Sequence, residues 1–510
     1  MPRYAAIDIG SNSVRMLAAD AAPDGSLQTL AADREVTRLG ESVFRAGSIS
    51  RQAIDFVSSV LARMAQTYKK LDVSGVRAVA TAAVRDASNQ SEFIARASEA
   101  VGSPVEIISG QEEARLIHLG VQNRWPHPKE KILIVDVGGG SAEIIYSERG
   151  RLQEAFSRPL GAVRLTGVFL RSDPPKPVEL DQMREFIEEK LAPALRKLQG
   201  IRVDRAIATS ATAAAMICAV NRVPRARREE ADRLRATERQ VRKLYKDLAE
   251  KDLSRRARVV GIGPRRAQII IPGVAVLLEC LDRFRLPALH YSTAGVRDGI
   301  IADLAARKVR SEVDHLSREQ RQVVEKAAMR YGVSLKHSRQ VALFCRILFE
   351  SFTGLHKLSP YWGKLLEAAA ILYDIGHFIS DTGHHKHAEY IVANLDLPGF
   401  TDRERLLIAT LCRFHRKSMP GIRHTAFNAL NPDDRKALLY LIPLLRIADS
   451  LDLSKAQRVG EMACTFQNGA VQLQIRGTGR IDLELWAGQR AGEVFEQIYN
   501  VPIAIARSRR

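Results

Sequence analysis

Two stretches of this chain place an aspartate near the end of an apolar run, directly before a turn of small residues. The first reads AAIDIGSNSV, residues 5–14, and the second reads ILIVDVGGGSAEII, residues 132–145. Glycine, asparagine and serine are common in tight turns, so a hairpin explains either stretch alone. It does not explain why Asp8 and Asp136 stand at the same place in both copies. This repetition indicates a functional site and not two ordinary hairpins.

Turns of this composition suit phosphate. Successive backbone N–H groups in a turn form a concave anion site, and small residues leave those groups accessible. Hydroxyl and amide side chains add further donors. We therefore predict that phosphate is bound by the residues of both turns, which are Gly10, Ser11, Asn12 and Ser13 in the first and Gly138, Gly139, Gly140 and Ser141 in the second.

The nearby carboxylates predict a divalent cation. Asp8 and Asp136 would repel a phosphate bound in the turns, whereas Mg²⁺ bridges carboxylate and phosphate oxygens and removes the conflict. Glu143 stands two residues beyond Ser141 in the next apolar run. If that run is a strand, Glu143 faces the same side as Ser141. We predict that Asp136, Glu143 and Asp8 hold Mg²⁺ or another divalent cation.

The elements that must position these residues change in type along the chain. Strand-like runs alternate with helical patterns up to about residue 310, which favours a multidomain α/β fold with two similar lobes. Helical periodicity then dominates to about residue 454, and two short alternating runs follow, ACTFQNGAVQLQIRG and RIDLELWAG. Within the first run, Asn468 and Gly469 signal a hairpin. We expect a helix near 489–500 and a strand at 501–505.

Length, charge and cysteine content limit the classes of protein to which this chain can belong. The chain has 510 residues, which is too long for one core. Its net charge of +19 attracts anions, and basic residues are dense between Arg222 and Arg266. The five cysteines form no C-x-x-C pair, which fits reduced thiols and a cytoplasmic location. The N-terminus shows no signal-peptide layout and no run approaches ~18 apolar residues, so no membrane span is expected.

The two turns resemble the facing loops of the actin and sugar-kinase superfamily, whose lobes are ribonuclease H-like. Four segments make the resemblance more specific. They are AAIDIGSNSVRM, VATAAVRDA, PVEIISGQEEARLIHLGV and LIVDVGGGSAEI, and they resemble the exopolyphosphatase and guanosine pentaphosphate phosphatase family, Ppx/GppA. GHHKHAEYIV, LPGF, RFHRK and LLRIADSLD resemble the helical part of the same family, so the resemblance runs from residue 4 to about 505.

Pattern and resemblance together predict four domains. They are an N-terminal ribonuclease H-like lobe over 1–125, a second such lobe over 126–310, an all-α HD-like domain over 311–455 and a small α+β domain over 456–510.

The segment SGQEEAR offers two neighbouring glutamates. Ser109 precedes a predicted helix and Glu112 stands three residues later, which is a capping box that gives Glu112 a structural role. Glu113 has no such role, and by itself would be an acidic residue that complements the helix dipole. The resemblance implies that Glu113 is the catalytic base, which takes a proton from the attacking water.

Two further predictions come from the resemblance. Arg85 in TAAVRDA matches a family arginine that contacts phosphate. The family segment Gly-Thr-Ser-Gly-Thr reads ATSAT here, residues 208–212, so Thr209 and Ser210 are predicted phosphate contacts. Ala208 and Ala211 carry Cβ atoms that restrict close approach of the backbone.

The helical part resembles an HD-type domain, in which His and Asp bind metal. An intact motif has adjacent His and Asp, but this chain reads ILYDIG, with Tyr373 before Asp374. His337 and Asp449 are the expected outer ligands. With one ligand replaced, we expect an architectural domain rather than a second active site. Its expected role is to line a polyanion groove with His384, His387, His415 and Lys417.

These inferences lead to an exopolyphosphatase that releases orthophosphate from the end of inorganic polyphosphate. The alternative substrate is guanosine pentaphosphate, with guanosine tetraphosphate as product. A sensor of polyphosphate or (p)ppGpp without turnover is disfavoured by the retained acidic residues, and a kinase by the lack of an adenosine-binding Gly-Gly signature near 261–263. No nucleic-acid module is recognisable. The family resemblance also implies a homodimer.

Overall fold

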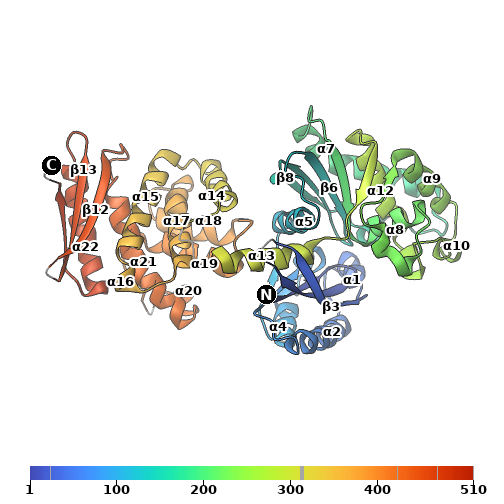
Figure 1. The fold of residues 1–510 in the computed structure, drawn as a ribbon, viewed down its shortest axis with the longest axis horizontal. Helices are drawn as coiled ribbons and strands as arrows, with labels where there is room; N and C mark the ends of the chain where they lie inside the picture. Colours follow the sequence, from blue (N-terminus) through green and yellow to red (C-terminus); the bar gives the residue numbers. More distant parts are fainter. Residues whose placement is uncertain (23–24, 311–314, 422, 468, 509–510) are drawn as a thin grey trace. The chain divides into compact units, whose positions relative to one another are not determined.

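The chain forms two compact units, Met1–Ala306 and Arg307–Arg510 (Figure 1). We refer to them as unit 1 and unit 2. A computed structural model describes residues 1–22, 25–310, 315–421, 423–467 and 469–508.

The first sheet of unit 1 has the strand order β3-β2-β1-β4-β5. An antiparallel meander opens it, and two further strands add parallel to β1. The strands are β1 (Arg3–Ile9), β2 (Val14–Ala21), β3 (Leu27–Glu35), β4 (Gly75–Ala80) and β5 (Val105–Ile107). Both faces of β1 and the end of β4 are buried, which explains why these strands are continuous apolar runs.

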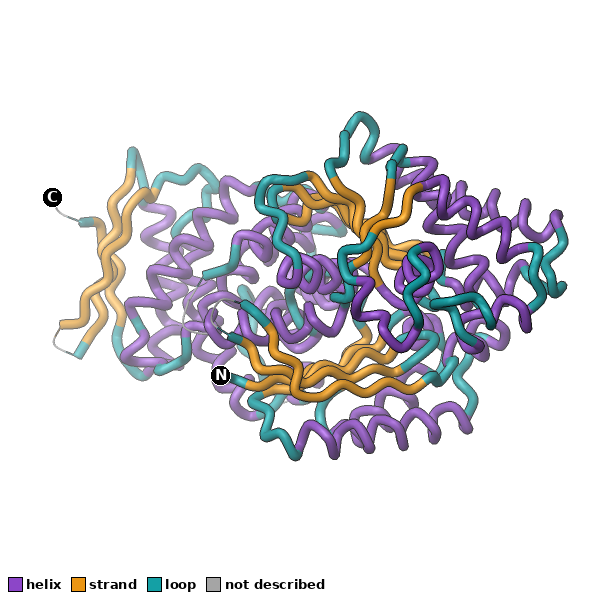
Figure 2. The backbone as a smooth tube through the Cα atoms, turned by 45° about the vertical axis from the view of Figure 1, so that its right-hand side comes forward, coloured by secondary structure: helices purple, strands orange, loops and turns teal. Residues whose placement is uncertain are grey.

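The second sheet repeats this topology and adds one edge strand. Its order is β10-β11-β9-β6-β7-β8, in which β6, β7 and β8 form the meander and β9 and β11 add in parallel. The strands are β6 (Lys131–Val137), β7 (Ala142–Glu148), β8 (Arg151–Arg158), β9 (Arg205–Thr209), β10 (Arg235–Thr237) and β11 (Ala288–Tyr291). Figure 2 shows the strands of unit 1 in orange with purple helices against them. The prediction of two similar α/β lobes is therefore confirmed.

Helices of unit 1 follow the strands that they cover. The first lobe contains α1 (Leu39–Ala46), α2 (Arg51–Lys69), α3 (Ala82–Asp86), α4 (Gln90–Val101) and α5 (Gly110–Arg124). The second contains α6 (Ala162–Phe169), α7 (Pro177–Lys197), α8 (Ser210–Val220), the 3-10 helix η1 (Arg225–Ala231), α9 (Glu238–Ala249), α10 (Leu253–Ala257), α11 (Pro264–Ala267), α12 (Ile270–Arg283) and α13 (Val296–Arg310).

The helix start predicted at Ser109 is present, and α2 begins in the same way. The hydroxyl of Ser50 accepts the N–H of Ala53 at the start of α2, and that of Ser109 accepts the N–H of Glu112 at the start of α5. The capping pattern thus placed the helix that carries Glu113.

Unit 2 begins with helices around a continuous apolar core. They are α14 (Arg318–Arg330), α15 (Leu335–Ser351), α16 (Thr353–His356), α17 (Pro360–Leu372), the 3-10 helix η2 (Tyr373–Phe378), α18 (His384–Asn394), α19 (Asp402–Phe414), α20 (Thr425–Asn428) and α21 (Pro432–Ser450). A three-stranded sheet of order β12-β13-β14 shares this core through Val471, Leu473 and Ile505. Its strands are β12 (Val459–Gln467), β13 (Ala470–Gly477) and β14 (Ile503–Arg507).

The second alternating run of the C-terminal part is a helix, so its predicted extended structure is wrong. RIDLELWAG enters α22 (Asp482–Tyr499) at Asp482, seven residues before the expected helix start at 489. Leu483, which contributed to the apparent alternation, is 47% exposed, and Trp486, which follows the alternating residues, is 54% exposed. Ala487, Gly488, Gly492 and Phe495 are buried at helical spacing. The hairpin expected at Asn468 and Gly469 includes position 468, which lies outside the described residues.

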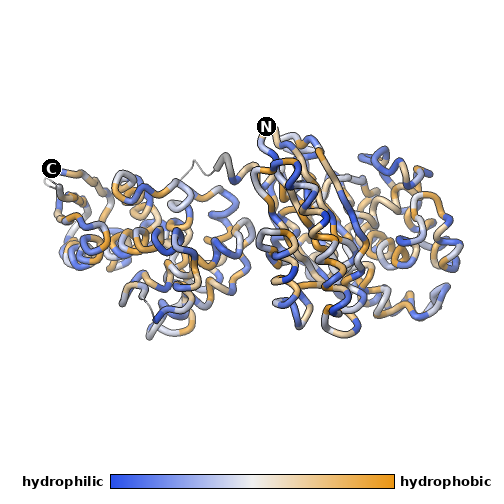
Figure 3. The backbone as a smooth tube through the Cα atoms, turned by 90° about the horizontal axis from the view of Figure 1, so that it is seen from below, coloured by the Kyte–Doolittle hydropathy of each residue, from blue (hydrophilic) through white to orange (hydrophobic). Residues whose placement is uncertain are grey.

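Hydrophobic and hydrophilic residues alternate along most helices in Figure 3, as expected for helices that bury one side. Of the helices that the structure describes, none combines the length and apolar character needed to cross a membrane.

Candidate active site

The two predicted turns line one cavity of unit 1. Asp8 and the 10–13 turn come from the end of β1, and Asp136 and the 138–141 turn come from the end of β6. Glu113, from the first turn of α5, lines the same cavity. The structure therefore brings together the residues that the repeated pattern singled out.

The two turns have the same internal hydrogen bond. Gly10 N–H donates to the carbonyl of Ser13 at 3.2 Å, and Gly138 N–H donates to that of Ser141 at 3.0 Å. Asp8 and Asp136 also hold equivalent positions, each one residue before the end of its strand. The duplication seen in the sequence is thus a duplication of backbone geometry.

A short helix holds the carbonyl groups of the second turn. The carbonyls of Gly138 and Gly139 accept N–H groups from the start of α6 at 2.9–3.1 Å, and that of Gly140 accepts Nε of Arg164 at 2.9 Å. In a trans peptide the C=O and the following N–H point in opposite directions. The N–H groups of Gly139, Gly140 and Ser141 are therefore turned away from α6, as an anion cradle requires.

The first turn is held in the same way near α1. The carbonyl of Ser11 accepts the N–H of Gly40 at 2.7 Å, and that of Asn12 accepts the N–H groups of Thr37 and Arg38, each at 3.2 Å. The N–H groups of Asn12 and Ser13 are thus turned to the opposite side. In both lobes, the segment after the meander orients the turn.

The glycines of the second turn also allow the two turns to meet. A Cβ on Gly139 would lie 3.1 Å from the backbone nitrogen of Asn12, and one on Gly140 would lie 2.6 Å from Oγ of Ser11. Small residues are thus needed for contact between the loops as well as for access of a ligand.

Helix α5 carries Glu113 against the second lobe. A Cβ on Gly110 would lie 2.2 Å from Cβ of Ser157 in β8, and Gln111 Nε2 donates to the carbonyl of Ala155 at 3.0 Å. Ser157 in turn donates to Glu143 at 2.8 Å. The tight contact at Gly110 therefore brings Glu113 close to Glu143.

Glu112 belongs to a buried ion-pair network, a larger structural role than a helix cap. Its carboxylate accepts Arg115 at 2.7 and 2.9 Å and Arg77 at 3.1 Å. Arg77 and Arg115 also pair with Asp303 of α13, at 3.1 and 3.0 Å. These contacts hold α5 to β4 and to α13, and they leave Glu113 as the glutamate that faces the cavity.

The buried carboxylates of the site repel one another, and their pKa values are raised. Burial, followed by the charge of Glu143, raises the pKa of Glu113 well above its ordinary value. Burial and the neighbouring Asp136 raise the pKa of Glu143 to about 8, and burial raises that of Asp136 to about 6. Oε2 of Glu113 is buried and has no hydrogen-bond partner among the described residues, and Nη1 of Arg85 lies 3.9 Å away. A bound cation would relieve this repulsion.

Predicted residues differ in their access to the cavity. Arg85 donates to the carbonyl of Ile108 at 2.6 Å and flanks Glu113, whereas Glu143 is 1% exposed and lies behind the cavity wall. Thr209 and Ser210 line the cavity, but their hydroxyls donate to the carbonyls of Ala294 and Val137, at 2.5 and 2.9 Å.

The positively charged side chains of the site were not predicted from the sequence. Four arginines line the cavity, namely Arg15, Arg228, Arg266 and Arg297. Burial and the repulsion of Arg15 and Arg228 lower the pKa of Arg266 to about 10. Two of these arginines come from the basic stretch after residue 222, where no local pattern separates them from surface charges. Their clustering indicates an anionic ligand.

A second cavity continues from the first and shares Asn12, Ala211, Ala214, Arg228 and Arg266 with it. Its remaining wall adds three arginines to small or apolar side chains, and its full lining is Asn12, Arg34, Val36, Ala211, Ala214, Ala215, Cys218, Arg225, Arg228, Gly261, Ile262, Arg265 and Arg266. These lining residues include neither a carboxylate nor an aromatic ring. The first cavity therefore combines carboxylates with arginines, and the second cavity offers arginines without carboxylates.

The carboxylates fit a hydrated Mg²⁺ better than a closed cage. Within the described ranges, Asp8, Asp136 and Glu143 do not bring three ligand atoms within 4.8 Å of one another. Mg²⁺ usually keeps several waters and binds one or two carboxylates together with substrate phosphates. Paired strand positions place Glu143 opposite Asp136, which favours these two as the nearest protein ligands.

In the part of unit 2 that was expected to be HD-like, a tyrosine hydroxyl lies between the expected ligands. Tyr373 OH lies 2.6 Å from Nε2 of His337 and donates to Asp449 at 2.7 Å. His337 Nδ1 lies 2.7 Å from Asp452. These contacts occupy the atoms that an HD-type metal ion would use.

The polyanion groove expected in unit 2 is not formed by all of its predicted residues. His384 and His415 are buried and lie against each other, so they are not presented on a surface. His387 is half-buried and Lys417 is exposed.

Comparison with known proteins agrees with this site. Residues 19–308 match the model of the Ppx/GppA phosphatase family, and residues 320–480 match that of Ppx/GppA phosphatase, domain III. The guanosine-5'-triphosphate,3'-diphosphate pyrophosphatases of Vibrio parahaemolyticus and Vibrio vulnificus are both 26% identical over 87% of this chain and 86% of their own length.

Solved structures resemble the same part of the chain. A Ppx/GppA family member from Aquifex aeolicus is 29% identical, with a TM-score of 0.53 over 60% of this chain and 98% of its own. An exopolyphosphatase from Cytophaga hutchinsonii is 25% identical, with a TM-score of 0.55 over 60% of this chain and 98% of its own. The chain thus belongs to the Ppx/GppA phosphatase family and is a hydrolase of phosphoanhydride bonds.

Proposed function

We propose that this protein is an exopolyphosphatase that hydrolyses the terminal phosphoanhydride bond of inorganic polyphosphate and releases orthophosphate. The observation that carries the proposal is the division of charge in the site. Buried carboxylates that repel one another in the first cavity favour a bound cation, and the arginines that line both cavities favour a chain of anions. A polyphosphate with a divalent cation satisfies both.

In this proposal the two turns bind the terminal phosphate. Backbone N–H groups of Gly139, Gly140 and Asn12 donate to its oxygens and align it. Glu113 takes a proton from a water molecule as the water oxygen attacks the terminal phosphorus. The bond from phosphorus to the bridging oxygen breaks, and its electron pair stays with the shortened chain. Alignment and charge neutralisation are the main requirements of this reaction.

A divalent cation, with Mg²⁺ as our proposal, would be held by Asp136 and Glu143, with Asp8 nearby. When bound it would neutralise charge on the phosphate oxygens. It would also lower the proton affinity of the carboxylates around it, so that Glu113 is available as a base near neutral pH. Arg85, 3.9 Å from Glu113, favours the charged form in the same way.

The second cavity favours polyphosphate over a nucleotide. A guanine base has O6 and N7 acceptors that arginine can bind, but it also offers N–H donors that need acceptors, and bases commonly stack on aromatic rings. The lining of the second cavity offers arginines, with neither a carboxylate nor an aromatic ring among the residues that form it. Arginines bind successive phosphates through planar, multidentate contacts.

Guanosine pentaphosphate remains the alternative substrate, because the Vibrio relatives that match 87% of this chain are named for it. The same carboxylates and turns would serve that reaction. The third candidate function is that of a sensor, which binds polyphosphate or (p)ppGpp without turnover. Measurement of phosphate release distinguishes such a sensor from an enzyme.

The remaining predictions concern architecture and setting. We propose that 311–455 is HD-like and acts without HD-type catalysis, since Tyr373 bonds to both His337 and Asp449. The domain limits at 125, 310 and 455, the homodimer and the cytoplasmic location also stay predictions.

The test compares phosphate release from long-chain polyphosphate, tripolyphosphate and guanosine pentaphosphate, with Mg²⁺ and with chelator. Arg225→Gln and Arg265→Gln should raise KM for the long chain and flatten its salt dependence, because each neutralised phosphate contributes a salt-sensitive term. Tripolyphosphate should change little. Arg239→Gln, an exposed arginine outside both cavities, is the control for net charge.

Each other outcome has a definite meaning. A larger kcat/KM for guanosine pentaphosphate would favour the alternative substrate. Binding of polyphosphate without phosphate release in Mg²⁺ would favour the sensor. Equal effects of Arg225→Gln and Arg239→Gln would remove the second cavity from the substrate path.

A further inference from the structure

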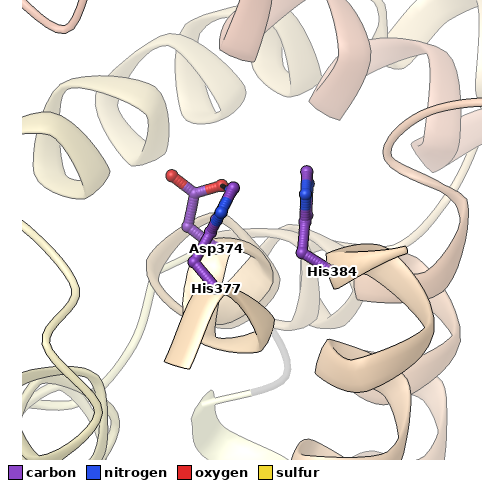
Figure 4. A group of neighbouring side chains, drawn as sticks. All are labelled: Asp374, His377 and His384. Atoms are coloured by element: carbon purple, nitrogen blue, oxygen red, sulfur yellow. Dashed lines mark ion pairs between the residues drawn. The ribbon is translucent and has the colours of Figure 1, made fainter. Parts of the chain in front are cut away.

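A cluster of imidazoles and one carboxylate lies in unit 2. Asp374 and His377 extend from η2, His384 extends from the first turn of α18, and all three point to the same side (Figure 4). One ligand atom from each lies within 4.8 Å of the others. His415, which follows α19, places its Nε2 3.2 Å from Nε2 of His384.

Hydrogen bonds determine which ring nitrogens of this cluster carry a proton. Nδ1 of His384 lies 3.1 Å from the carbonyl oxygen of Asp381, and Nδ1 of His415 lies 2.7 Å from that of Cys412. A carbonyl oxygen only accepts, so each Nδ1 donates and each neutral ring has an unprotonated Nε2. Two lone pairs thus face each other at 3.2 Å, which no hydrogen bond between neutral rings explains.

His377 has the same kind of outer contact. Its Nδ1 lies 2.6 Å from the Asp381 carboxylate, and its Nε2 lies 3.5 Å from Oδ1 of Asp374. Histidines that bind metal regularly donate their other N–H to a carbonyl or carboxylate, which fixes the ring and its tautomer. All three rings of the cluster, those of His377, His384 and His415, are held in this way.

Two separations within the cluster are those of neighbouring ligands of one tetrahedral ion. Two ligands bound at about 2.0–2.1 Å to such an ion lie about 3.3–3.4 Å apart. The 3.2 Å between the Nε2 atoms of His384 and His415 and the 3.5 Å between His377 and Asp374 are close to this value. His384 and His415 are 4% and 3% exposed, so a proton shared between them would place an imidazolium in a buried position.

The nearby cations leave the ligand atoms accessible. Lys455 Nζ lies 2.5 Å from Oδ2 of Asp374, which leaves Oδ1 toward His377. Nη1 of Arg416 lies 3.4 Å from both ring nitrogens of His384. Equal distances to both nitrogens place the guanidinium against the ring and away from the axis of the Nε2 lone pair.

We propose that Asp374, His377 and His384, whose ligand atoms lie within 4.8 Å of one another, form a zinc site in unit 2, and that a shift of the His415 ring toward them completes it. Three imidazoles and a carboxylate are ligands that Zn²⁺ prefers, and four protein ligands make the site structural. The ion would join η2, α18 and the end of α19. These elements already fit tightly, because a Cβ on Gly376 would lie 1.9 Å from the carbonyl oxygen of His384.

This site is distinct from the HD-type position. Tyr373 OH bonds to His337 and Asp449, so those side chains are directed to the hydroxyl. Asp374 alone is common to the HD-type pattern and to the proposed zinc site. Replacement of a histidine by Tyr373 would thus have accompanied a shift of the metal toward His384 and His415.

The test uses the full-length protein, stripped with chelator and then titrated with Zn²⁺ in excess Mg²⁺ by calorimetry. His377→Ala and His415→Ala should each weaken one zinc-binding event by more than about tenfold, since loss of even an outer contact of a metal ligand costs 10–100-fold. Zn²⁺ should raise Tm of the stripped wild type more than that of either variant. Co²⁺ should give the visible absorption of a tetrahedral site in the wild type only.

His387→Ala is the matched control, because it lies on α18 outside the cluster and should behave as wild type. His377 is 36% exposed in its side chain, so His377→Ala tests the site without opening the core if His415→Ala fails to fold. The proposal is overturned if the wild type takes up no more Zn²⁺ than His377→Ala, or if His387→Ala loses the same zinc.

Discussion

The turns after β1 and β6 share a backbone and differ in the residue paired with their aspartate. Arg15 stands opposite Asp8 in the β1–β2 pair, whereas Glu143 stands opposite Asp136 in the β6–β7 pair. Arg15 and Arg297 partly offset the effect of burial on the pKa of Asp8. Burial and Asp136 raise the pKa of Glu143 to about 8.

The residue at one cross-strand position therefore gives the two equivalent turns opposite electrostatic character. The first lobe supplies its own cation beside the aspartate, and the second lobe accumulates negative charge. We infer that a metal ion would be anchored mainly in the second lobe, while the first lobe mainly holds phosphate. A duplicated fold can thus divide two tasks of phosphoryl transfer by a single substitution per strand pair.

The largest effect should come from Glu113, which faces both lobes. Glu113→Gln keeps the size of the side chain but removes the base, so kcat should fall by roughly 10²–10⁴-fold. KM should change little. The measurement is phosphate release at saturating substrate.

Its neighbour is the matched control. Glu112→Gln weakens the buried pairs with Arg77 and Arg115, which should cost about 3–5 kcal/mol of unfolding free energy in a urea titration. Phosphate release per folded molecule should remain near wild type. If Glu112→Gln abolished turnover in folded protein while Glu113→Gln did not, the roles would be reversed.

The sequence predicted most of what depends on local pattern. The repeated apolar run, aspartate and turn placed Asp8 and Asp136 correctly, because strand ends and tight turns are local structures. Ser109 marked the start of α5 for the same reason. The ion-pair network of Glu112 was not visible, since Arg77 and Asp303 are distant in sequence.

Features that depend on long-range packing escaped prediction. Arg266 and Arg228 line the cavity, but in the sequence they are part of a long basic stretch. The alternation of RIDLELWAG spans too few residues to reveal the helical spacing that continues to Phe495. Contact between His384 and His415 joins α18 to the end of α19, which sequence spacing alone does not show.

A smaller effect is expected on the Mg²⁺ dependence of activity, and it should differ between the aspartates of the two lobes. Asp136→Asn should raise the Mg²⁺ concentration for half-maximal phosphate release by at least about tenfold, in the range of 10–100-fold for damaged metal sites. Asp8→Asn should shift it less, because Arg15 already lies opposite. Both variants are measured by titrating Mg²⁺ at fixed substrate. A larger shift for Asp8→Asn would place the ion in the first lobe.

The smallest effect is a pH dependence of stability that comes from Glu143. Its pKa of about 8 in the folded protein exceeds the ordinary 4.5, so the metal-free folded state holds a proton that the unfolded chain releases. This contribution to stability is complete below about pH 4.5 and is lost as pH rises through about 8. Glu143→Gln cannot ionise. The Tm of Glu143→Gln, measured relative to that of the metal-free wild type, should therefore rise by a few degrees between pH 5 and pH 9.

Glu148→Gln is the control for that difference, because Glu148 lies on the same strand with a side chain 36% exposed. Comparing variants removes the general effect of lowering the +19 charge at high pH. Mg²⁺ should reduce the gain, because an ion bound beside Glu143 favours its charged form. If the Tm difference between wild type and Glu143→Gln did not change with pH, or if Glu148→Gln reproduced it, Glu143 would not carry the excess negative charge that separates the second lobe from the first.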